Sequence, residues 1–123
     1  MEIIQTENMP KPNGHYSNCI KYNGLLYLSG QLPKNLETGE FETGIENQTK
    51  RVLNNIKLIL NEAGSDINKI LQIRIYIAEI EYWDIVNKIY AEFFEDHKPV
   101  RTIVPVNKLH YNVLIEIEAI AIA

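Results

Sequence analysis

The sequence predicts an α+β fold in which one sheet is covered on one face by two helices, with the elements in the order ββαβαββ. Three observations support this prediction. Apolar residues alternate along residues 113–123, the pair Asn23-Gly24 separates two apolar-rich runs, and two longer segments repeat apolar residues at three-four spacing. These patterns are typical of a strand, a tight hairpin and amphipathic helices, respectively.

The N-terminal half is expected to form a hairpin followed by a helix. Residues 17–22 and 25–30 flank Asn23-Gly24, and both of these turn residues can adopt the positive φ that a two-residue hairpin requires. Residues 45–63 should form the first helix, because their apolar side chains follow three-four spacing and Gly64 is a natural C-terminal stop.

The C-terminal half is expected to add a strand, a second helix and two final strands. Residues 70–77 alternate and should form the third strand, whose apolar face would hold Leu71, Ile73, Ile75 and Ile77. Residues 82–96 repeat apolar and aromatic side chains at helical spacing, and Lys98-Pro99 should end this second helix. Residues 101–123 supply strands four and five.

The last strand has two unlike faces. One face is wholly apolar and consists of Val113, Ile115, Ile117, Ala119 and Ala121. The other face carries Glu116 and Glu118 beside apolar residues, which is unusual for a strand that faces solvent. Because two helices can cover only one face of a five-stranded sheet, we expect another subunit to cover the second face.

Length and composition predict a single globular domain spanning residues 1–123, because the chain is 46% hydrophobic and 23% charged. The single cysteine, Cys19, excludes a disulfide within the chain and favours a reducing, cytoplasmic location. The N-terminus lacks signal-peptide features and no apolar run reaches membrane length. A net charge of −4 without a basic cluster argues against nucleic-acid binding.

The sequence contains no motif for a nucleotide or a metal. It has no Gly-x-Gly-x-x-Gly, no Gly-x4-Gly-Lys-Ser/Thr and no Cys-x-x-Cys, and its three histidines are not at metal-ligand spacing from carboxylates. No cofactor and no metal are therefore expected, and catalysis should depend on ordinary side chains and bound water.

Arg101, Glu116 and Glu118 are the charged candidates for a functional site. A guanidinium at the start of an apolar strand is suited to gripping a carboxylate, although it could equally form a structural salt bridge with Glu116 or Glu118. Two neighbouring carboxylates in a partly dry site would have raised pKa values and could act as acid or base. They could also form a salt bridge or a polar rim at a subunit contact.

Four further residues give weaker signals. Ser29 and Gly30 close the second strand, where a glycine permits close approach to a ligand but could also mark a bulge or a turn. Tyr16 could supply a phenol to the site, or could be an interface tyrosine whose hydroxyl end faces water. Asn87 is polar beside the apolar stripe of the second helix, where it could also be an ordinary surface amide.

Segments along nearly the whole chain, taken together, match one known family. They are residues 6–10, 14–16, 28–33 (Leu-Ser-Gly-Gln-Leu-Pro), 38–40, 48–55, 63–64, 86–94, 99–102 (Pro-Val-Arg-Thr) and 115–119. In this order they resemble the RidA (YjgF-type) reactive-intermediate deaminases. The resemblance implies a chorismate-mutase-like fold, a homotrimer with ligand pockets between subunits, and cofactor-independent hydrolysis of enamines and imines, such as 2-aminoacrylate and 2-aminocrotonate, to 2-keto acids and ammonia.

The resemblance also implies roles for individual residues. Arg101 matches the arginine that grips the substrate carboxylate, and Glu116 matches the residue that positions and deprotonates the attacking water. Ser29 and Tyr16 match residues of the family whose hydroxyl groups line the same pocket. Backbone or polar contacts with the substrate are implied for the positions that hold Gly30, Ile103 and Asn87 in this sequence. Glu118 has no implied catalytic part and is expected to support the structure.

Three departures from the family pattern affect this expectation. Ile103 stands where deaminating members often have cysteine, and His110 and His15 replace residues that fix loop shape. Two alternatives to an enzyme therefore stay open. One is a binding or regulatory module for a small carboxylate such as a keto acid. The other is an RNA-directed translation inhibitor or ribonuclease, as described for some members of the family.

Overall fold

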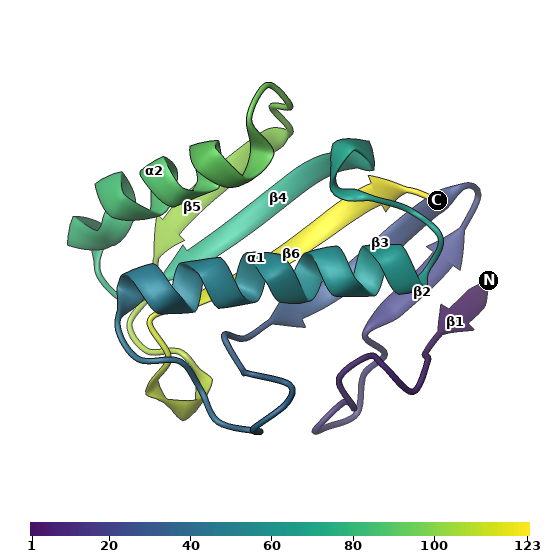
Figure 1. Ribbon diagram of the computed structural model, residues 1–123, viewed down its shortest axis with the longest axis horizontal. Coiled ribbons are helices and arrows are strands. Elements are labelled where there is room, and N and C mark those ends of the chain that lie inside the picture. Colours follow the sequence, from purple (N-terminus) through teal and green to yellow (C-terminus); the bar gives the residue numbers. More distant parts are fainter.

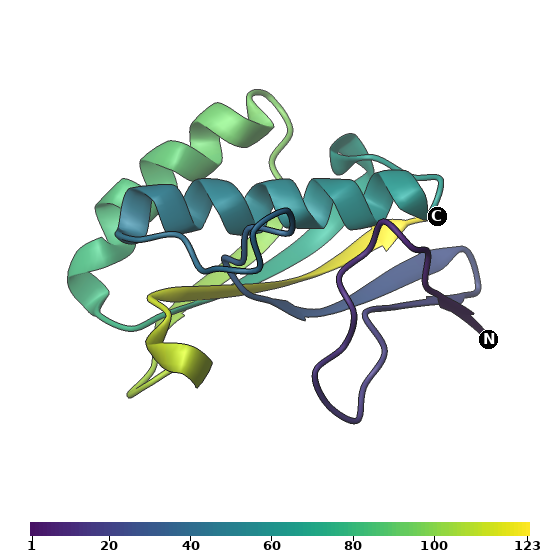
Figure 2. The same cartoon turned by 60° about the horizontal axis from the view of Figure 1, so that its bottom comes forward.

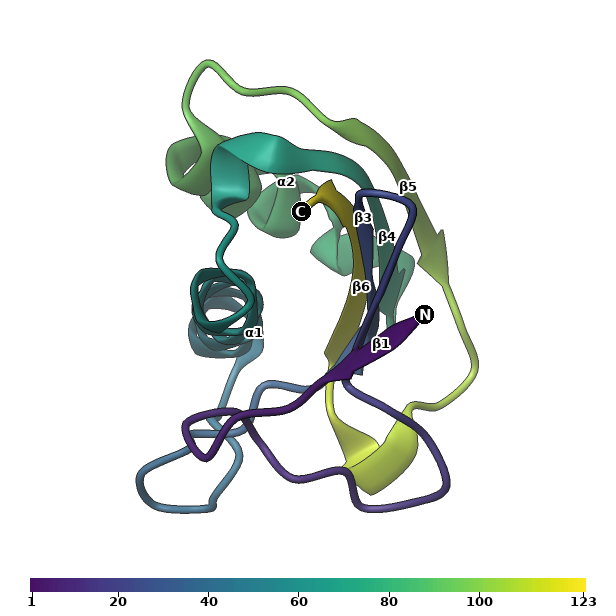
Figure 3. The same ribbon diagram turned by 90° about the vertical axis from the view of Figure 1, so that its right-hand side faces the viewer.

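The computed structural model describes all residues from 1 to 123 as one sheet with two α-helices packed on one of its faces (Figures 1 and 3). Three short 3-10 helices, Ile67–Lys69, Ile80–Tyr82 and His110–Asn112, lie in connections. The main elements are β1 (Glu2–Ile4), β2 (Cys19–Tyr22), β3 (Leu25–Gln31), α1 (Ile45–Glu62), β4 (Ile70–Ile77), α2 (Trp83–Phe94), β5 (Val100–Pro105) and β6 (Ile115–Ile122).

The strands lie in the order β1-β2-β3-β6-β4-β5. All neighbours pair antiparallel except β4 and β5, which run parallel because α2 connects them by a crossover. The C-terminal strand β6 therefore lies in the middle of the sheet, between β3 and β4. The predicted α+β class, with one sheet and two helices on a single face, is confirmed, as is the chorismate-mutase-like arrangement.

The predicted order ββαβαββ is wrong in one respect, because an additional strand precedes the hairpin. β1 pairs with β2, and Ile3 lies opposite Ile20. This strand has only three residues, and Ile3 is 60% exposed, so it offers no alternating pattern in the sequence. The predicted hairpin turn is confirmed, since Asn23 and Gly24 both have positive φ.

The predicted position of Leu71 on the buried face of its strand is also wrong. Leu71 is 44% exposed, whereas Ile70 is fully buried. The register between β4 and β6 shifts between Ile70 and Gln72, which marks a β-bulge. An extra residue in one strand reverses the alternation at that point, so Ile70 takes the inward position that the pattern assigned to Leu71.

The hydrophobic core lies between the helices and one face of the sheet. Figure 2 shows α1 crossing over the strands on the same side as α2. The apolar face predicted for the last strand is confirmed, since all five of its residues are buried, and β4 contributes Ile73, Ile75 and Ile77. The opposite face has no helix over it and includes exposed apolar side chains such as Tyr27 and Ile122. Neither α-helix combines the length and the hydropathy required to cross a bilayer.

Candidate functional site

The candidate residues fall into two groups on opposite faces of the sheet. Side chains of paired residues on neighbouring strands point to the same face. Arg101 on β5 pairs with Ile73, which is fully buried beneath the helices, so Arg101 lies on the helix-covered face. Glu116 on β6 pairs with Tyr76, which alternates with the buried residues of β4, so Glu116 lies on the open face.

The two groups are also offset along the sheet. Arg101 lies level with Ala119, because both pair with Ile73, whereas Glu116 is three residues away along β6. Strand β4 separates β5 from β6. Within one chain, the structure therefore does not bring Arg101 and Glu116 into a common pocket.

The arginine cluster consists of Arg101 and the residues of α2 that surround it: Trp83, Asn87 and Tyr90. Arg101 Nη1 donates a hydrogen bond of 2.9 Å to Asn87 Oδ1. The guanidinium carbon lies 4.7 Å from the ring centroid of Tyr90 and 5.5 Å from that of Trp83, within the range of cation–π attraction. Ile103 follows Arg101 on the same face of β5 and packs partly buried against the core.

Arg101 has no carboxylate partner. The protein has two ion pairs, which join Arg51 to Glu42 at 3.4 Å and Arg74 to Glu118 at 3.7 Å. Within one chain, Arg101 therefore forms no salt bridge with Glu116 or Glu118. The guanidinium, which has no ion-pair partner, lies beside a cavity of about 350 Å³, whose lining includes Asn87, Tyr90, Glu95, His97, Lys98 and Arg101 itself.

The glutamate cluster consists of Glu116 on β6 with Ser29 and Gly30 at the end of β3. The register between β3 and β6 shifts between Leu28 and Gln31, so Gly30 lies in an irregular part of the pairing. A Cβ atom added at Gly30 would meet Glu116 Oε2 at 2.5 Å, which is closer than any real contact. Glycine here leaves room for the Glu116 carboxylate to lie directly against the backbone, and a larger residue would displace that carboxylate.

Burial raises the pKa of the Glu116 carboxyl, and the negative charge of Glu118 raises this pKa further. The nearby His110, in the 3-10 helix before β6, opposes this shift. Glu118 is held on the same face by a hydrogen bond from Tyr76 Oη and by the ion pair with Arg74. Glu118 is therefore anchored by neighbouring side chains, while no hydrogen bond holds the half-buried Glu116 carboxylate.

The predicted hydroxyl groups lie near Gly30 but not in contact with Arg101. Ser29 Oγ accepts a hydrogen bond of 3.3 Å from Gln31 Nε2. Tyr16 is 49% exposed, and its Oη accepts a hydrogen bond from the Asn13 backbone. Tyr16 and Gly30 line a second cavity of about 350 Å³ between the N-terminal arm and the loop after β3.

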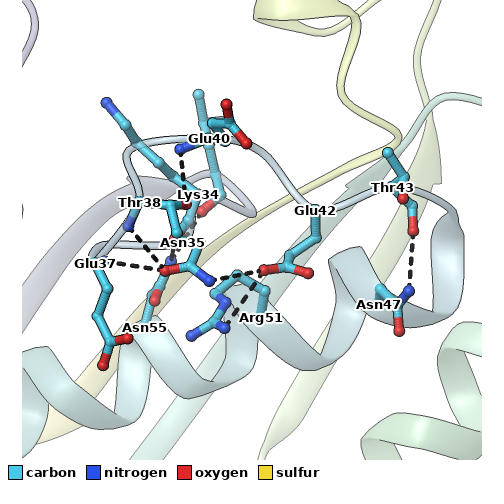
Figure 4. Close-up of polar contacts among 11 residues, drawn as sticks. Lys34, Asn35, Glu37, Thr38, Glu40, Glu42, Thr43, Asn47, Arg51 and Asn55 are labelled. Carbon is cyan, nitrogen blue, oxygen red and sulfur yellow. Dashed lines mark hydrogen bonds and ion pairs between the residues drawn. The ribbon is translucent and has the colours of Figure 1, made fainter.

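Side chains from helix α1 fix that loop, as Figure 4 shows. Asn55 Nδ2 donates to the backbone carbonyl of Lys34 at 2.9 Å and to that of Leu32 at 3.2 Å. Arg51 and Asn35 both bind Glu42, at 3.4 and 3.2 Å. The loop wall of the second cavity is therefore held in place by the helix behind it.

The structure contains no group of three or more His, Cys, Asp or Glu side chains placed to bind a metal ion. Cys19 is fully buried, and burial raises its pKa to about 11, so its thiol is a packed core group that stays protonated.

Two contributors to the arginine cluster were not identified as site residues from the sequence. Trp83 and Tyr90 belong to the apolar stripe of the second helix, and their spacing alone indicates core packing. The position of Asn87 between them offers a signal, because residues 83, 87 and 90 follow i, i+4, i+7 spacing on one helix face. The amide contacts Arg101 itself, so Asn87 orients the arginine.

Comparison with known proteins identifies the family. The family model for Endoribonuclease L-PSP matches residues 6–123. A RutC family protein of Pyrococcus horikoshii is 46% identical over 121 residues, which are 98% of this chain and 96% of that protein. Among solved structures, RidA from the Antarctic bacterium Psychrobacter sp. has a TM-score of 0.95 and 29% identity, with 100% of both chains covered. TdcF of E. coli, solved with bound serine, has a TM-score of 0.94 and 31% identity, with 100% of this chain and 99% of that chain covered.

The structural similarities define the class of protein: it is a small α+β protein of the RidA and YjgF type. The chain belongs to the Endoribonuclease L-PSP family, whose model spans all but its first five residues. The resemblance to RidA stated from the sequence is confirmed.

Proposed function

We propose that the protein hydrolyses reactive enamine and imine intermediates of the 2-aminoacrylate and 2-aminocrotonate type to 2-keto acids and ammonia. The observation that best supports this activity is the state of Arg101. It is the one arginine of three without a carboxylate partner, and an amide and two aromatic rings hold it beside a cavity. An oriented guanidinium with an unmatched charge is suited to binding the carboxylate of a 2-imino acid through paired hydrogen bonds.

Glu116 is proposed to position and deprotonate the attacking water. The enamine first tautomerises to the imine, water then adds to the imine carbon, and the resulting carbinolamine collapses to the keto acid as ammonia leaves. A carboxylate with a raised pKa accepts a proton from water more readily than an ordinary one and can return it to the departing nitrogen. General acid–base assistance of this kind contributes roughly 10²–10⁴-fold.

The remaining candidates have supporting roles in this proposal. Ser29 and Tyr16 supply hydroxyl groups that orient water or substrate, and Gly30 offers its backbone beside the Glu116 carboxylate. Ile103 can contact the substrate through its backbone only. The reaction uses no cofactor, because an imine carbon is already electrophilic and needs only an oriented water and a proton relay.

The active pocket in this proposal forms between two copies of the chain. Arg101 and Glu116 lie on opposite faces of one sheet, so a single chain offers the parts of a pocket without joining them. A homotrimer, as the RidA resemblance implies, would place the glutamate cluster of one copy against the arginine cluster of the next. The open sheet face, with its exposed apolar side chains, is the surface available for that association.

A coupled assay tests the activity. A dehydratase or an amino-acid oxidase generates the enamine, and semicarbazide traps the imine that remains. Wild-type protein should suppress the trapped adduct, and Arg101→Ala and Glu116→Ala should not. Lys57→Ala serves as the control for loss of a cation, because Lys57 is exposed on α1 and belongs to neither cluster. If wild-type protein leaves the adduct untouched, the deaminase proposal is wrong.

A small-carboxylate binding module is the second candidate. Its support is the bound serine in the TdcF structure, a small molecule with a carboxylate. A binding module would show affinity for keto acids that depends on Arg101, without any rate that depends on Glu116. An RNA-directed activity is disfavoured by the net charge of −4, and filter binding across a range of salt concentrations would reveal it.

A further inference from the structure

We propose that Trp83 and Tyr90 are positioning residues, which hold the plane of the Arg101 guanidinium so that its free N–H edge faces the substrate carboxylate. The inference rests on the proposed function for the identity of the ligand. It gives Trp83 and Tyr90 a role in orienting Arg101, beyond packing against the core. Asn87 completes the arrangement by fixing one corner of the guanidinium.

The geometry of helix α2 creates this arrangement. Residues 83, 87 and 90 are spaced i, i+4 and i+7, so they form one stripe along the helix. The stripe reads aromatic, amide, aromatic, and Arg101 on β5 meets all three members. The Arg101 side chain reaches from β5 to this stripe, which is how one arginine contacts both rings and the amide.

The chemistry of guanidinium explains why rings are suitable partners. The group has five N–H donors, all in its plane, while its two faces can form no strong hydrogen bond. An aromatic ring attracts the cation through its face and uses none of those donors. Asn87 accepts from Nη1 only, so most of the in-plane edge stays available for a carboxylate. A carboxylate partner such as Glu42 or Glu118 would instead neutralise the charge and occupy the edge.

The two rings differ in burial. Tyr90 is 7% exposed and packs against Phe94 with ring centroids 4.5 Å apart, so it is a fixed wall. Trp83 is 37% exposed and lies on the solvent side. The Tyr90 hydroxyl is buried without a hydrogen-bond partner, and burial raises its pKa to about 12, so the phenol stays neutral. The ring of Tyr90, and not its hydroxyl, is therefore the part that acts on Arg101.

Side-chain NMR tests this inference independently of any activity. The chain has only three arginines, so the Nε–Hε signal of Arg101 can be assigned from its loss in Arg101→Lys. The wild-type Arg101 signal should show restricted motion, and Trp83→Leu and Tyr90→Leu should release it. Tyr90→Phe keeps the ring and should leave Arg101 as ordered as in wild type. Arg51, which is paired with Glu42 and contacts neither ring, is the internal control in every spectrum.

Isothermal titration with 2-oxobutanoate provides the binding readout. Trp83→Leu should raise Kd about two- to fivefold and Tyr90→Leu roughly five- to thirtyfold, while Tyr90→Phe stays near wild type. In the deaminase assay the same variants should raise KM with little change in kcat, because the carboxylate is held alike in ground and transition states. Thermal unfolding and size-exclusion chromatography check that each variant is folded and assembled. If Tyr90→Leu fails to fold, Trp83→Leu still tests the inference, because Trp83 is exposed.

The outcomes separate this inference from the proposed function. If deamination is absent but Arg101 order falls in Trp83→Leu and Tyr90→Leu, the positioning role stands and the deaminase proposal fails. If deamination is present while Arg101 order and KM are unchanged in both variants, the rings are only packing and the inference is overturned.

Discussion

The arginine cluster and the glutamate cluster hold their charged groups in different ways. Arg101 is oriented by direct partners, namely an amide and two rings from α2. Glu116 has no hydrogen-bond partner and is poised instead by partial burial and by the glycine backbone against it. The geometry of the cation is therefore set by contacts, whereas the surroundings of the carboxylate mainly change its pKa.

Each cluster holds only one of the two charged groups that the proposed reaction uses. No carboxylate contacts Arg101, and no lysine or arginine pairs with Glu116. Arg74 lies on the same face as Glu116, but Glu118 occupies it. The comparison therefore favours a pocket shared between copies of the chain, with charge recognition from one and proton transfer from the other.

Substitution of the two neighbouring glutamates should give the largest effect. Glu116→Gln removes the proposed base and should lower the deamination rate by roughly 10²–10⁴-fold. Glu118→Gln is the matched control on the same strand face, and a much smaller loss is expected because Tyr76 and Arg74 already engage Glu118. Steady-state kinetics of the two variants checks this, and equal losses would contradict the assignment of Glu116 as the base.

Substitution of Gly30 should give the next largest effect on rate. The Cβ of Gly30→Ala would displace the Glu116 carboxylate, and a displacement of about 1 Å can cost on the order of 10²-fold in rate. Folding should survive, because the displaced atoms end a flexible side chain. Gly14→Ala is the control, since its Cβ would lie 3.5 Å from the Tyr16 ring, an ordinary contact. A fully active Gly30→Ala variant would show that the position of Glu116 does not matter.

A pair of tyrosines distinguishes the two clusters by stability. Tyr76→Phe removes the hydroxyl that donates to Glu118 and should lower the free energy of unfolding by about 1 kcal/mol. Tyr90→Phe removes a hydroxyl without a partner and should change stability by less than about 0.5 kcal/mol. Chemical denaturation at a fixed protein concentration measures both, and a larger loss for Tyr90→Phe would reveal a partner for that hydroxyl.

The smallest expected effect is the pH dependence of stability at Glu116. Because folding raises the pKa of this carboxyl, its contribution to stability is fully present below the unfolded pKa and is lost as pH rises through the folded pKa. Glu116→Gln should therefore be more stable than wild type at pH 7. The difference should vanish below the ordinary glutamate pKa of about 4.3. Unfolding curves across this range test the sign, and a Glu116→Gln variant less stable at pH 7 would contradict it.

The sequence was sufficient for elements with a clear period and insufficient where the sheet order matters. The hairpin at Asn23-Gly24 and both helices follow from local patterns, which are physical properties of short segments. Strand β1 and the bulge at Leu71 have no such local signal, because they depend on pairing with distant strands. The alternation of apolar residues along a strand also does not show which strand lies next to it in the sheet.

The site shows the same limit. Arg101 and Glu116 could be singled out by residue type and by the family resemblance, but their separation onto two faces depends on β4 lying between β5 and β6. Trp83 and Tyr90 could not be identified as site residues from the sequence. Helical spacing does not distinguish a ring that packs on the core from a ring that packs on a guanidinium. Contacts between elements, and not the pattern within one, decide these roles.

Complementation between two inactive variants tests the shared pocket most directly. Arg101→Ala and Glu116→Ala are each expected to be inactive alone, and they are co-expressed or refolded together at equal amounts. If each pocket takes Arg101 from one copy and Glu116 from another, random mixing should restore about a quarter of the wild-type deaminase activity, because half of the copies supply each intact residue. A mixture that demonstrably contains hybrid oligomers yet stays inactive, beside an active wild type, would contradict the account.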